Sequence, residues 1–266
     1  MRSFVYVTAI ICLLGLTVSA APAAAQGARG NAGRVPRAAD GKPDLQGIWQ
    51  VQNRAAYDLQ VHDARPGMLA GEGVVEGGDI PYRPEAAAKK AENFSSRQTA
   101  DPLLKCYMPG VPRIMYLDFA FQIFQTPTHI AETFEWSQLH RLIYMNGTKP
   151  PAGIDFWMGD SRGHWEGDTL VVEVTNHNDR TWFDMAGDFH SDALRVVERY
   201  TLVDVNTIQY EATIDDPKVF TRPWTISMPF HRQTQMRRLP EYHCAAELEE
   251  GTGAFTRDPR TWPPAP

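Results

Sequence analysis

A polar loop over residues 176–192 carries the densest group of side chains that can perform acid–base chemistry. It holds two imidazoles, His177 and His190, together with several carboxylates. An imidazole titrates near neutral pH, so His190 can act as a general base whose ring is oriented by Asp179 or Asp192. The same residue types also form polar loops that fold on their own side-chain turns, and that structural interpretation stays open.

Two glutamates form a second candidate group. Each interrupts a row of alternate residues that is otherwise apolar: Glu132 among Ile130, Phe134 and Trp136, and Glu198 among Leu194, Val196, Tyr200 and Leu202. Alternate residues of a strand share one face, so both carboxylates point inward if these rows line an interior. A buried carboxylate must be paired or protonated. Pairing with Arg113, Arg141 or Arg199 is the structural interpretation, and a carboxyl group with a raised pKa that serves as acid or base is the functional one.

Metal and organic cofactors are not expected. His177 and His190 lack the four-residue helical spacing that indicates zinc, and the chain has no Cys-x-x-Cys pair. Adjacent aspartates are common in loops that bind no calcium. The chain has neither a phosphate-binding glycine loop nor a dinucleotide-binding fingerprint, and no nucleophilic serine is assigned.

The N-terminus has the features of a secretory signal peptide. Arg2 precedes an apolar run from Phe4 to Val18, and small residues with Ala23-Ala24-Ala25 follow before Gln26. These features predict cleavage after residue 25 and a periplasmic or secreted protein. The run is too short to cross a bilayer comfortably, and no later apolar stretch is longer, so no membrane span is expected.

Charge and cysteine content narrow the partners. Removal of residues 1–25 takes away one of the 26 Lys and Arg residues and none of the 32 Asp and Glu residues, which leaves a formal charge of −7. An acidic domain binds nucleic acid poorly, because phosphate binding requires a basic face. Cys12 is lost with the same segment. The remaining Cys106 and Cys244 most simply form one disulfide in an oxidising compartment, and a catalytic thiol with a spare cysteine is the rival interpretation.

Most of the chain has the pattern of short strands. Alternating apolar residues predict some nine or ten antiparallel strands, at residues 47–52, 119–125, 130–136, 141–145, 163–175 as a hairpin, 194–202, 207–214, 224–231 and 238–246. One helix is predicted from Arg83-Pro84 to Glu92, because proline suits a first turn and alanines favour propagation. Barrel closure would remove exposed edges. We therefore expect a mainly β, single antiparallel β-barrel with one short helix, and a β-sandwich as the alternative.

The expected domain limits follow from these elements. We expect the signal peptide at 1–25, a flexible leader at 26–41, the barrel domain at 42–250 and a Pro-rich tail at 251–266. Residues 55–80 have many glycines and no apolar period, which indicates a long irregular loop. Asn146-Gly147 is a tight-turn signal that ends the strand over 141–145.

Several motifs together resemble those of a family of secreted bacterial proteins, and they cover nearly the whole mature chain. They are specific as a set: Pro43-Asp44-Leu45-Gln46-Gly47-Ile48-Trp49, Pro109-Gly110-Val111-Pro112-Arg113, Trp165-Glu166-Gly167-Asp168-Thr169-Leu170-Val171-Val172, Asn178-Asp179-Arg180-Thr181-Trp182, His190-Ser191 and Asp215-Asp216-Pro217. The resemblance implies a barrel of the lipocalin or calycin type. It carries over no catalytic residue.

These observations favour an enzyme that acts, without an organic cofactor, on a small and largely apolar molecule, aromatic ones included. Proton abstraction followed by elimination or isomerisation suits the candidate groups, and a retro-aldol lyase is one concrete version. Hydrolysis by activated water is an alternative. The expected roles are His190 as base, Asp179 as its orienter, Glu198 or Glu132 as acid, and Arg113 or Arg199 as anion stabiliser.

Five residues are expected to contact a ligand in the barrel: Trp49, Tyr116, Asn178, Trp182 and Tyr200. Trp49 also suits a plug at the barrel floor, where core packing alone explains it. The rival hypotheses from other classes are a non-catalytic protein that carries a hydrophobic ligand and a structural envelope protein with a filled barrel. A small molecule is thus the expected partner, and no oligomeric state is predicted.

Overall fold

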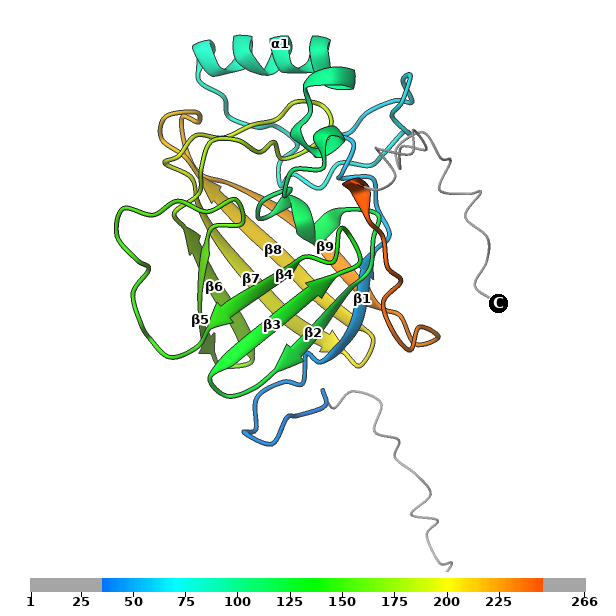
Figure 1. Cartoon of the computed structure of the whole chain (residues 1–266), viewed down its shortest axis with the longest axis vertical. Coiled ribbons are helices and arrows are strands. Elements are labelled where there is room, and N and C mark those ends of the chain that lie inside the picture. The colour runs from blue at the N-terminus through cyan, green and yellow to red at the C-terminus, as the bar shows by residue number, and fades with distance from the viewer. Residues whose placement is uncertain (1–34, 246–266) are drawn as a thin grey trace, which may run out of the picture. The chain divides into compact units, whose positions relative to one another are not determined.

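A closed barrel of nine strands lies at the centre of the computed structural model, which describes residues 35–245 (Figure 1). Each strand pairs with the next along the chain, and the last strand pairs with the first. The strands are β1 (Gly47–Val51), β2 (Phe121–Gln125), β3 (His129–Phe134), β4 (His140–Tyr144), β5 (Asp160–Glu166), β6 (Thr169–Thr175), β7 (Arg195–Asp204), β8 (Thr207–Asp215) and β9 (Trp224–Arg232). The mainly β barrel predicted from the strand pattern is confirmed.

One pair of neighbours departs from the predicted antiparallel arrangement. β4 and β5 run parallel, with Ile143 opposite Ser161, whereas the other eight pairs are antiparallel. Parallel neighbours cannot be joined by a tight hairpin, so the chain crosses over through residues 145–159. After β4, the Thr148 N–H donates to Asn146 Oδ1 over 3.2 Å and forms a local side-chain turn instead.

The strand predicted over residues 238–246 is wrong for its described part, 238–245. This segment forms no strand, and Tyr242 forms one isolated bridge with Trp136. Because β9 already pairs with β1, the barrel has no free edge to which another strand could add.

The single α-helix in the described part, α1 (Pro84–Ala100), begins where predicted but continues past Glu92. Proline opens its first turn, and its buried residues are Ala86 and Asn93. Asn93 Nδ2 donates to the carbonyl of Gly187 over 3.1 Å, which docks the helix on the loop between β6 and β7. Two 3₁₀ turns follow, η1 (Pro102–Lys105) and η2 (Arg113–Tyr116). Across residues 35–245 there is no helix with the length and apolar character needed to cross a membrane.

The connections at the two ends of the barrel differ in length. Short turns join β2 to β3, β5 to β6 and β7 to β8 at one end. Three long connections lie at the other end, where Figure 1 shows α1: residues 52–120, which include α1, 176–194 and 216–223. Residues 145–159 run from the end of the short turns to this end, because β4 and β5 are parallel. Loops placed on a rigid scaffold commonly carry function, so this covered end is where a site is expected.

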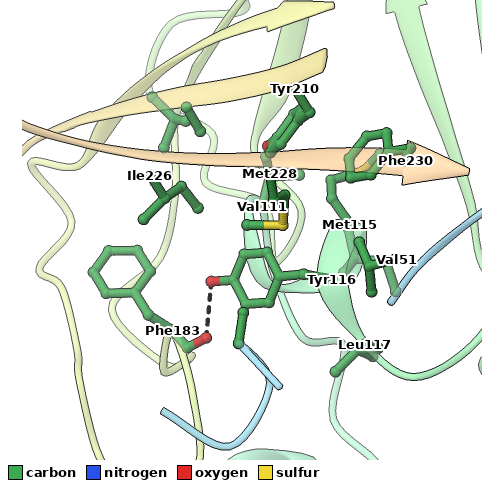
Figure 2. Close-up of a cluster of buried hydrophobic side chains, with 14 of the residues drawn as sticks. Val51, Val111, Met115, Tyr116, Leu117, Phe183, Tyr210, Ile226, Met228 and Phe230 are labelled. Atoms are coloured by element: carbon green, nitrogen blue, oxygen red, sulfur yellow. Dashed lines mark hydrogen bonds between the residues drawn. The ribbon is translucent and has the colours of Figure 1, made fainter. Parts of the chain in front are cut away.

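The barrel interior is filled by alternate side chains and by η2. The inward residues of β8, Ile208, Tyr210, Ala212 and Ile214, are all fully buried. All four residues of η2 are buried as well, and Figure 2 shows Met115 and Tyr116 packed among Met228, Phe230 and other core residues. The Tyr116 hydroxyl donates to the carbonyl of Phe183 over 2.9 Å, so this turn is joined to the β6–β7 loop.

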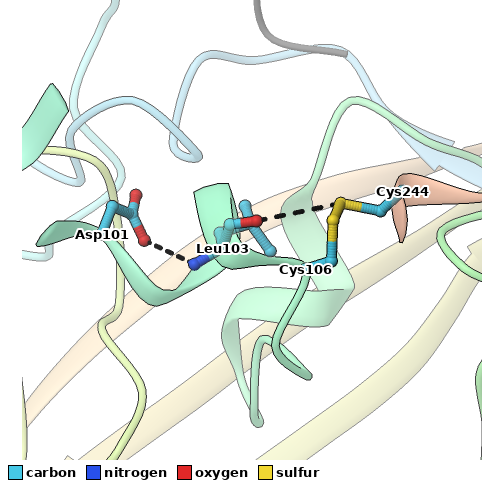
Figure 3. Close-up of a disulfide and its surroundings, with 4 residues drawn as sticks. All are labelled: Asp101, Leu103, Cys106 and Cys244. Atoms are coloured by element: carbon cyan, nitrogen blue, oxygen red, sulfur yellow. Dashed lines mark hydrogen bonds between the residues drawn. A yellow bond between two sulfur atoms is a disulfide. The ribbon is translucent and has the colours of Figure 1, made fainter. Parts of the chain in front are cut away.

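The predicted disulfide between Cys106 and Cys244 is present (Figure 3). It ties the segment after η1 to the segment after β9, which are 138 residues apart in the chain. Asp101 strengthens the same region, because it accepts the Leu103 N–H over 2.9 Å and two guanidinium bonds from Arg113, over 2.8 and 2.7 Å. Arg113 is therefore held in a buried, bidentate ion pair.

Residues 37–42, which belong to the segment expected to be a flexible leader, make defined contacts with the barrel and with each other. Arg37 donates both terminal nitrogens to Asp168 in the β5–β6 turn, over 2.6 and 2.5 Å, and the Ala38 N–H donates to the Lys42 carbonyl over 2.8 Å. The signal peptide, the first part of the leader and the Pro-rich tail fall on residues 1–34 and 246–266, outside the described residues.

Candidate functional site

Strand register brings a charged cluster together inside the barrel. Glu132 on β3 lies opposite Arg141 on β4, and Glu198 on β7 lies opposite Ala212 on β8. All three charged side chains are 4% exposed or less. The prediction that both glutamates face inward is confirmed, and Arg141, one of three arginines considered as their partner, is the one that pairs with them.

Arg141 is the centre of this cluster. Its Nη1 lies 3.1 Å from Glu132 Oε2, its Nη2 pairs with Glu198 Oε2, and its Nε donates to Ser161 Oγ over 2.9 Å. Glu198 Oε1 also accepts the hydroxyls of Tyr200 and Tyr210, over 3.1 and 2.8 Å. Glu198 is thus fully bonded, and the Arg141 charge is opposed by two carboxylates.

Glu132 is bonded less completely than Glu198. Its Oε1 is buried and has no hydrogen-bond partner among the described residues. Burial in the barrel raises the pKa of Glu132 to about 7, although Arg141 opposes part of this rise and Glu198 adds to it. A carboxyl group with a pKa near 7 can donate or accept a proton at physiological pH, which is the property required of a general acid or base.

His177 lies nearby at the covered end of the barrel. It follows Asn176, which has a left-handed backbone and donates its side-chain amide to the carbonyls of Pro151 and Ile154, over 2.7 and 2.9 Å. His177 is fully buried, and neither ring nitrogen makes a well-formed hydrogen bond to a described residue. Burial, with smaller contributions from the neighbouring His190 and Arg141, lowers the pKa of His177 to about 3, so the imidazole is neutral.

His190, the expected base, has both ring nitrogens occupied. Nε2 lies 2.7 Å from Thr181 Oγ1, and Nδ1 lies 2.9 Å from the carbonyl of Ser191. The carbonyl can only accept, so Nδ1 carries the proton and Nε2 accepts the threonine hydroxyl. Burial lowers the pKa of His190 and keeps the ring neutral. Thr181 and His190 resemble a nucleophilic hydroxyl beside its base. The two side chains are buried, however, and the Ser191 carbonyl orients the imidazole where a nucleophilic site would have a carboxylate.

The other expected catalytic residues, Asp179, Arg199 and Arg113, do not belong to the charged cluster around Arg141. Asp179 is exposed, and it is not among the hydrogen-bond partners of the His190 ring. Arg199 points outward with a side chain that is 39% exposed, and it pairs with Glu166. Arg113 is buried but already bound to Asp101. None of these three occupies the position of Arg141 beside Glu132.

The residues expected to contact a ligand do not share one surface. Tyr116, Tyr200 and Trp49 are fully buried, and Asn178 and Trp182 are partly exposed in the β6–β7 loop. Trp49 Nε1 donates to the carbonyl of Leu45 over 2.9 Å, and the guanidinium of Arg232 covers its ring at 4.1 Å. This environment is that of a core plug.

Ser161 lies in the pentapeptide Gly159-Asp160-Ser161-Arg162-Gly163, which has the Gly-x-Ser-x-Gly spacing of a nucleophile elbow. An elbow requires a sharp turn from a strand to a helix. Here Asp160 to Glu166 form β5, and the Ser161 hydroxyl accepts a hydrogen bond from Arg141 Nε. The serine therefore helps to position the guanidinium.

Three buried groups, Glu132, Arg141 and His177, thus combine the means to exchange a proton and to stabilise an anion. Sequence pattern identified Glu132 and placed His177 in the loop, but it assigned Arg141 only as an ion-pair partner. The signal that identifies Arg141 is its position opposite Glu132 across a predicted strand pair. Comparison of the chain with protein-family models, with curated proteins and with solved structures finds no match.

Proposed function

We propose that this protein is an extracytoplasmic enzyme that performs acid–base chemistry, without an organic cofactor, on a small and largely apolar molecule. Elimination, isomerisation or retro-aldol cleavage fits the groups available. The disulfide supports the compartment, because such bonds persist in oxidising environments. The observation that carries the reaction class is the pairing of Glu132, whose pKa is raised to about 7, with the Arg141 guanidinium 3.1 Å away.

The proposed roles follow from protonation and charge. Glu132 exchanges the proton, because its Oε1 is free and it is poised between its two protonation states near pH 7. Arg141 stabilises the negative charge that develops when a proton leaves a carbon next to a carbonyl group. His177, neutral over the physiological range, offers two unpaired ring nitrogens as a second polar contact. Because these groups are buried, a substrate reaches them only if the loops at the covered end move.

A panel of small molecules tests the proposal. The purified chain is incubated with β-hydroxy ketones, aromatic ketones and lipid-like molecules, and products are detected by mass. We expect new product masses from the wild type and from Glu166→Gln, a control at an exposed glutamate. Glu132→Gln should lower turnover at least a hundredfold, and His177→Leu should lower it as well. Product formation that is unchanged in Glu132→Gln would remove Glu132 from the mechanism.

A non-catalytic carrier is the second candidate. It is favoured by the bonding of Arg141, whose charge two carboxylates already oppose, so the cluster is nearly complete without a substrate. The same panel separates the two functions. A carrier retains one panel member unchanged through gel filtration, and no variant or wild-type protein converts any member.

A further inference from the structure

Three carboxylates converge outside the barrel lumen, beneath α1. Asp58 belongs to the connection after β1, and Asp184 and Asp188 belong to the β6–β7 loop. They are 6%, 0% and 0% exposed, and each places one oxygen within 4.8 Å of the others. The acid–base chemistry proposed above uses none of them.

The backbone orients these carboxylates as acceptors. The Leu59 N–H donates to Asp184 Oδ2 over 2.9 Å, the Asp188 N–H donates to Asp184 Oδ1 over 3.1 Å, and the Gln60 N–H donates to Asp58 Oδ1 over 2.9 Å. Hydrogen bonds of this kind hold an ionised carboxylate in one orientation.

One buried carboxylate oxygen of the cluster, Asp188 Oδ2, has no partner among the described residues. Asp188 Oδ1 accepts the Tyr82 hydroxyl over 2.8 Å and lies 3.6 Å from Lys90 Nζ. Asp188 Oδ2, in contrast, is buried and has no partner among the described residues. Burial of a carboxylate oxygen without a hydrogen-bonding or ionic partner costs on the order of several kcal/mol. This oxygen therefore requires a cation or a proton.

The direct contacts of the cluster include one cationic side chain for three carboxylates. Lys90 Nζ lies 3.6 Å from Asp188 Oδ1, and within residues 35–245 neither Asp58 nor Asp184 forms an ion pair with a Lys, Arg or His side chain. A divalent cation would supply the two further positive charges that three ionised carboxylates require.

We propose that Asp58, Asp184 and Asp188 bind a divalent cation of the hard, oxygen-preferring class, with Ca²⁺ as the first choice. A site whose protein ligands are carboxylate oxygens disfavours soft metals, which prefer sulfur ligands. Mg²⁺ gives up its waters reluctantly and demands octahedral geometry, so a buried site built from irregular loops suits Ca²⁺ better. The cation would join the connection after β1 to the β6–β7 loop and so hold the cover over the barrel.

Calcium binding and thermal unfolding test the proposal on the full chain after treatment with EDTA. Isothermal titration with CaCl₂, and with MgCl₂ for comparison, is carried out on the wild type, on Asp188→Asn and on Asp79→Asn, a control at an exposed aspartate nearby. We expect one Ca²⁺ per chain in the wild type and the control, and at least tenfold weaker binding in Asp188→Asn. Asp58→Asn is the replacement if Asp188→Asn does not fold.

Thermal unfolding separates a lost ligand from a lost structural contact. In EDTA, Asp188→Asn should melt at or above the wild-type temperature, because one buried charge is removed. Ca²⁺ should raise the melting temperature of the wild type and the control but not that of the variant. Absence of Ca²⁺ binding at millimolar concentration, or equal binding by Asp188→Asn, would overturn the proposal. A wild-type protein that responds to acid but to neither cation would show a shared proton instead.

Discussion

The ionisation of Glu132 makes a specific prediction about stability and pH. Burial raises its pKa from 4.5 to about 7 in the folded chain. Below pH 4.5 the carboxyl group is protonated in the folded and the unfolded chain, so it does not lower the free energy of unfolding there. Between pH 4.5 and 7 the unfolded chain loses this proton while the folded chain keeps it, so the free energy of unfolding falls as pH rises, and it levels off above pH 7. Each pH unit of difference corresponds to about 1.4 kcal/mol, so the total is on the order of 3 kcal/mol.

The variant Glu132→Gln isolates this effect, because glutamine has nearly the same shape and does not ionise. We expect the free energy of unfolding of the variant, minus that of the wild type, to increase by on the order of 3 kcal/mol from pH 4.5 to pH 8. Urea unfolding at a series of pH values, followed by tryptophan fluorescence, measures both proteins. Taking the difference removes the contribution of titrating groups that do not interact with Glu132.

Glu166→Gln is the matched control at an exposed site. The hydrogen bond from Arg199 lowers the pKa of Glu166, so this carboxylate stabilises the fold above its ordinary pKa, and that contribution is lost as pH falls. Its difference curve should therefore slope in the opposite direction. A Glu132→Gln curve that is flat between pH 4.5 and 8 would refute the reasoning, because it would mean that Arg141 holds Glu132 ionised despite its burial.

Two further predictions concern His177 and the disulfide. Burial lowers the pKa of His177 from 6.5 to about 3. The unfolded chain therefore takes up a proton at His177 before the folded chain does, and the free energy of unfolding falls by on the order of 5 kcal/mol as pH falls from 6.5 to 3. His177→Leu should lose this acid sensitivity in pH-dependent urea unfolding, and an unchanged acid limb would contradict it. The Cys106–Cys244 bond closes a loop of 138 residues, so its removal in a Cys106→Ser/Cys244→Ser double variant should lower the free energy of unfolding by about 5 kcal/mol. Equal urea midpoints for the two forms would contradict that expectation.

Strand parity predicted the inward position of both glutamates because a strand has a fixed side-chain period of two. Glu132 and Glu198 are the only charged residues in their rows, and a barrel leaves them no alternative face. The identity of their partner depends on register between strands, which residues 132 and 141 share directly across the β3–β4 pair. Parity says nothing about Arg113, which lies outside the predicted strands, and it places Arg199 on the outer face, because Arg199 follows Glu198 directly in one strand. Pairing across β3 and β4 then selects Arg141.

Local sequence pattern could not predict that β4 and β5 are parallel, or that the described segment after β9 forms no strand. Asn146-Gly147 has the composition of a hairpin turn, yet the next strand begins only at Asp160 and runs in the same direction as β4. Whether a strand-like segment joins a sheet depends on a free edge elsewhere in the fold. Residues 238–245 have none, since β1 and β9 close the barrel.

The sequence could not predict the hydrogen bonds that His190 makes in the folded loop. An imidazole near aspartates in the chain suggests a base with a carboxylate orienter, but Asx and threonine side chains in such loops bond to their closest neighbours. Thr181 and the Ser191 carbonyl occupy the ring nitrogens of His190, and Asp216 accepts the Ser191 backbone and hydroxyl instead. The imidazole left without strong partners is His177, whose burial no spacing rule predicts.

The stability and activity of this chain should depend on one and the same titration. If Glu132 exchanges the proton in catalysis, the pH at which kcat/KM changes must match the pH near 7 at which the Glu132→Gln difference curve levels off, because both report the pKa of one carboxyl group in the free protein. A rate profile that changes at another pH would assign catalysis to a different group while leaving the account of stability intact. A matching pair of values would tie the reaction to the charged cluster inside the barrel, since no exposed carboxylate titrates there without such burial.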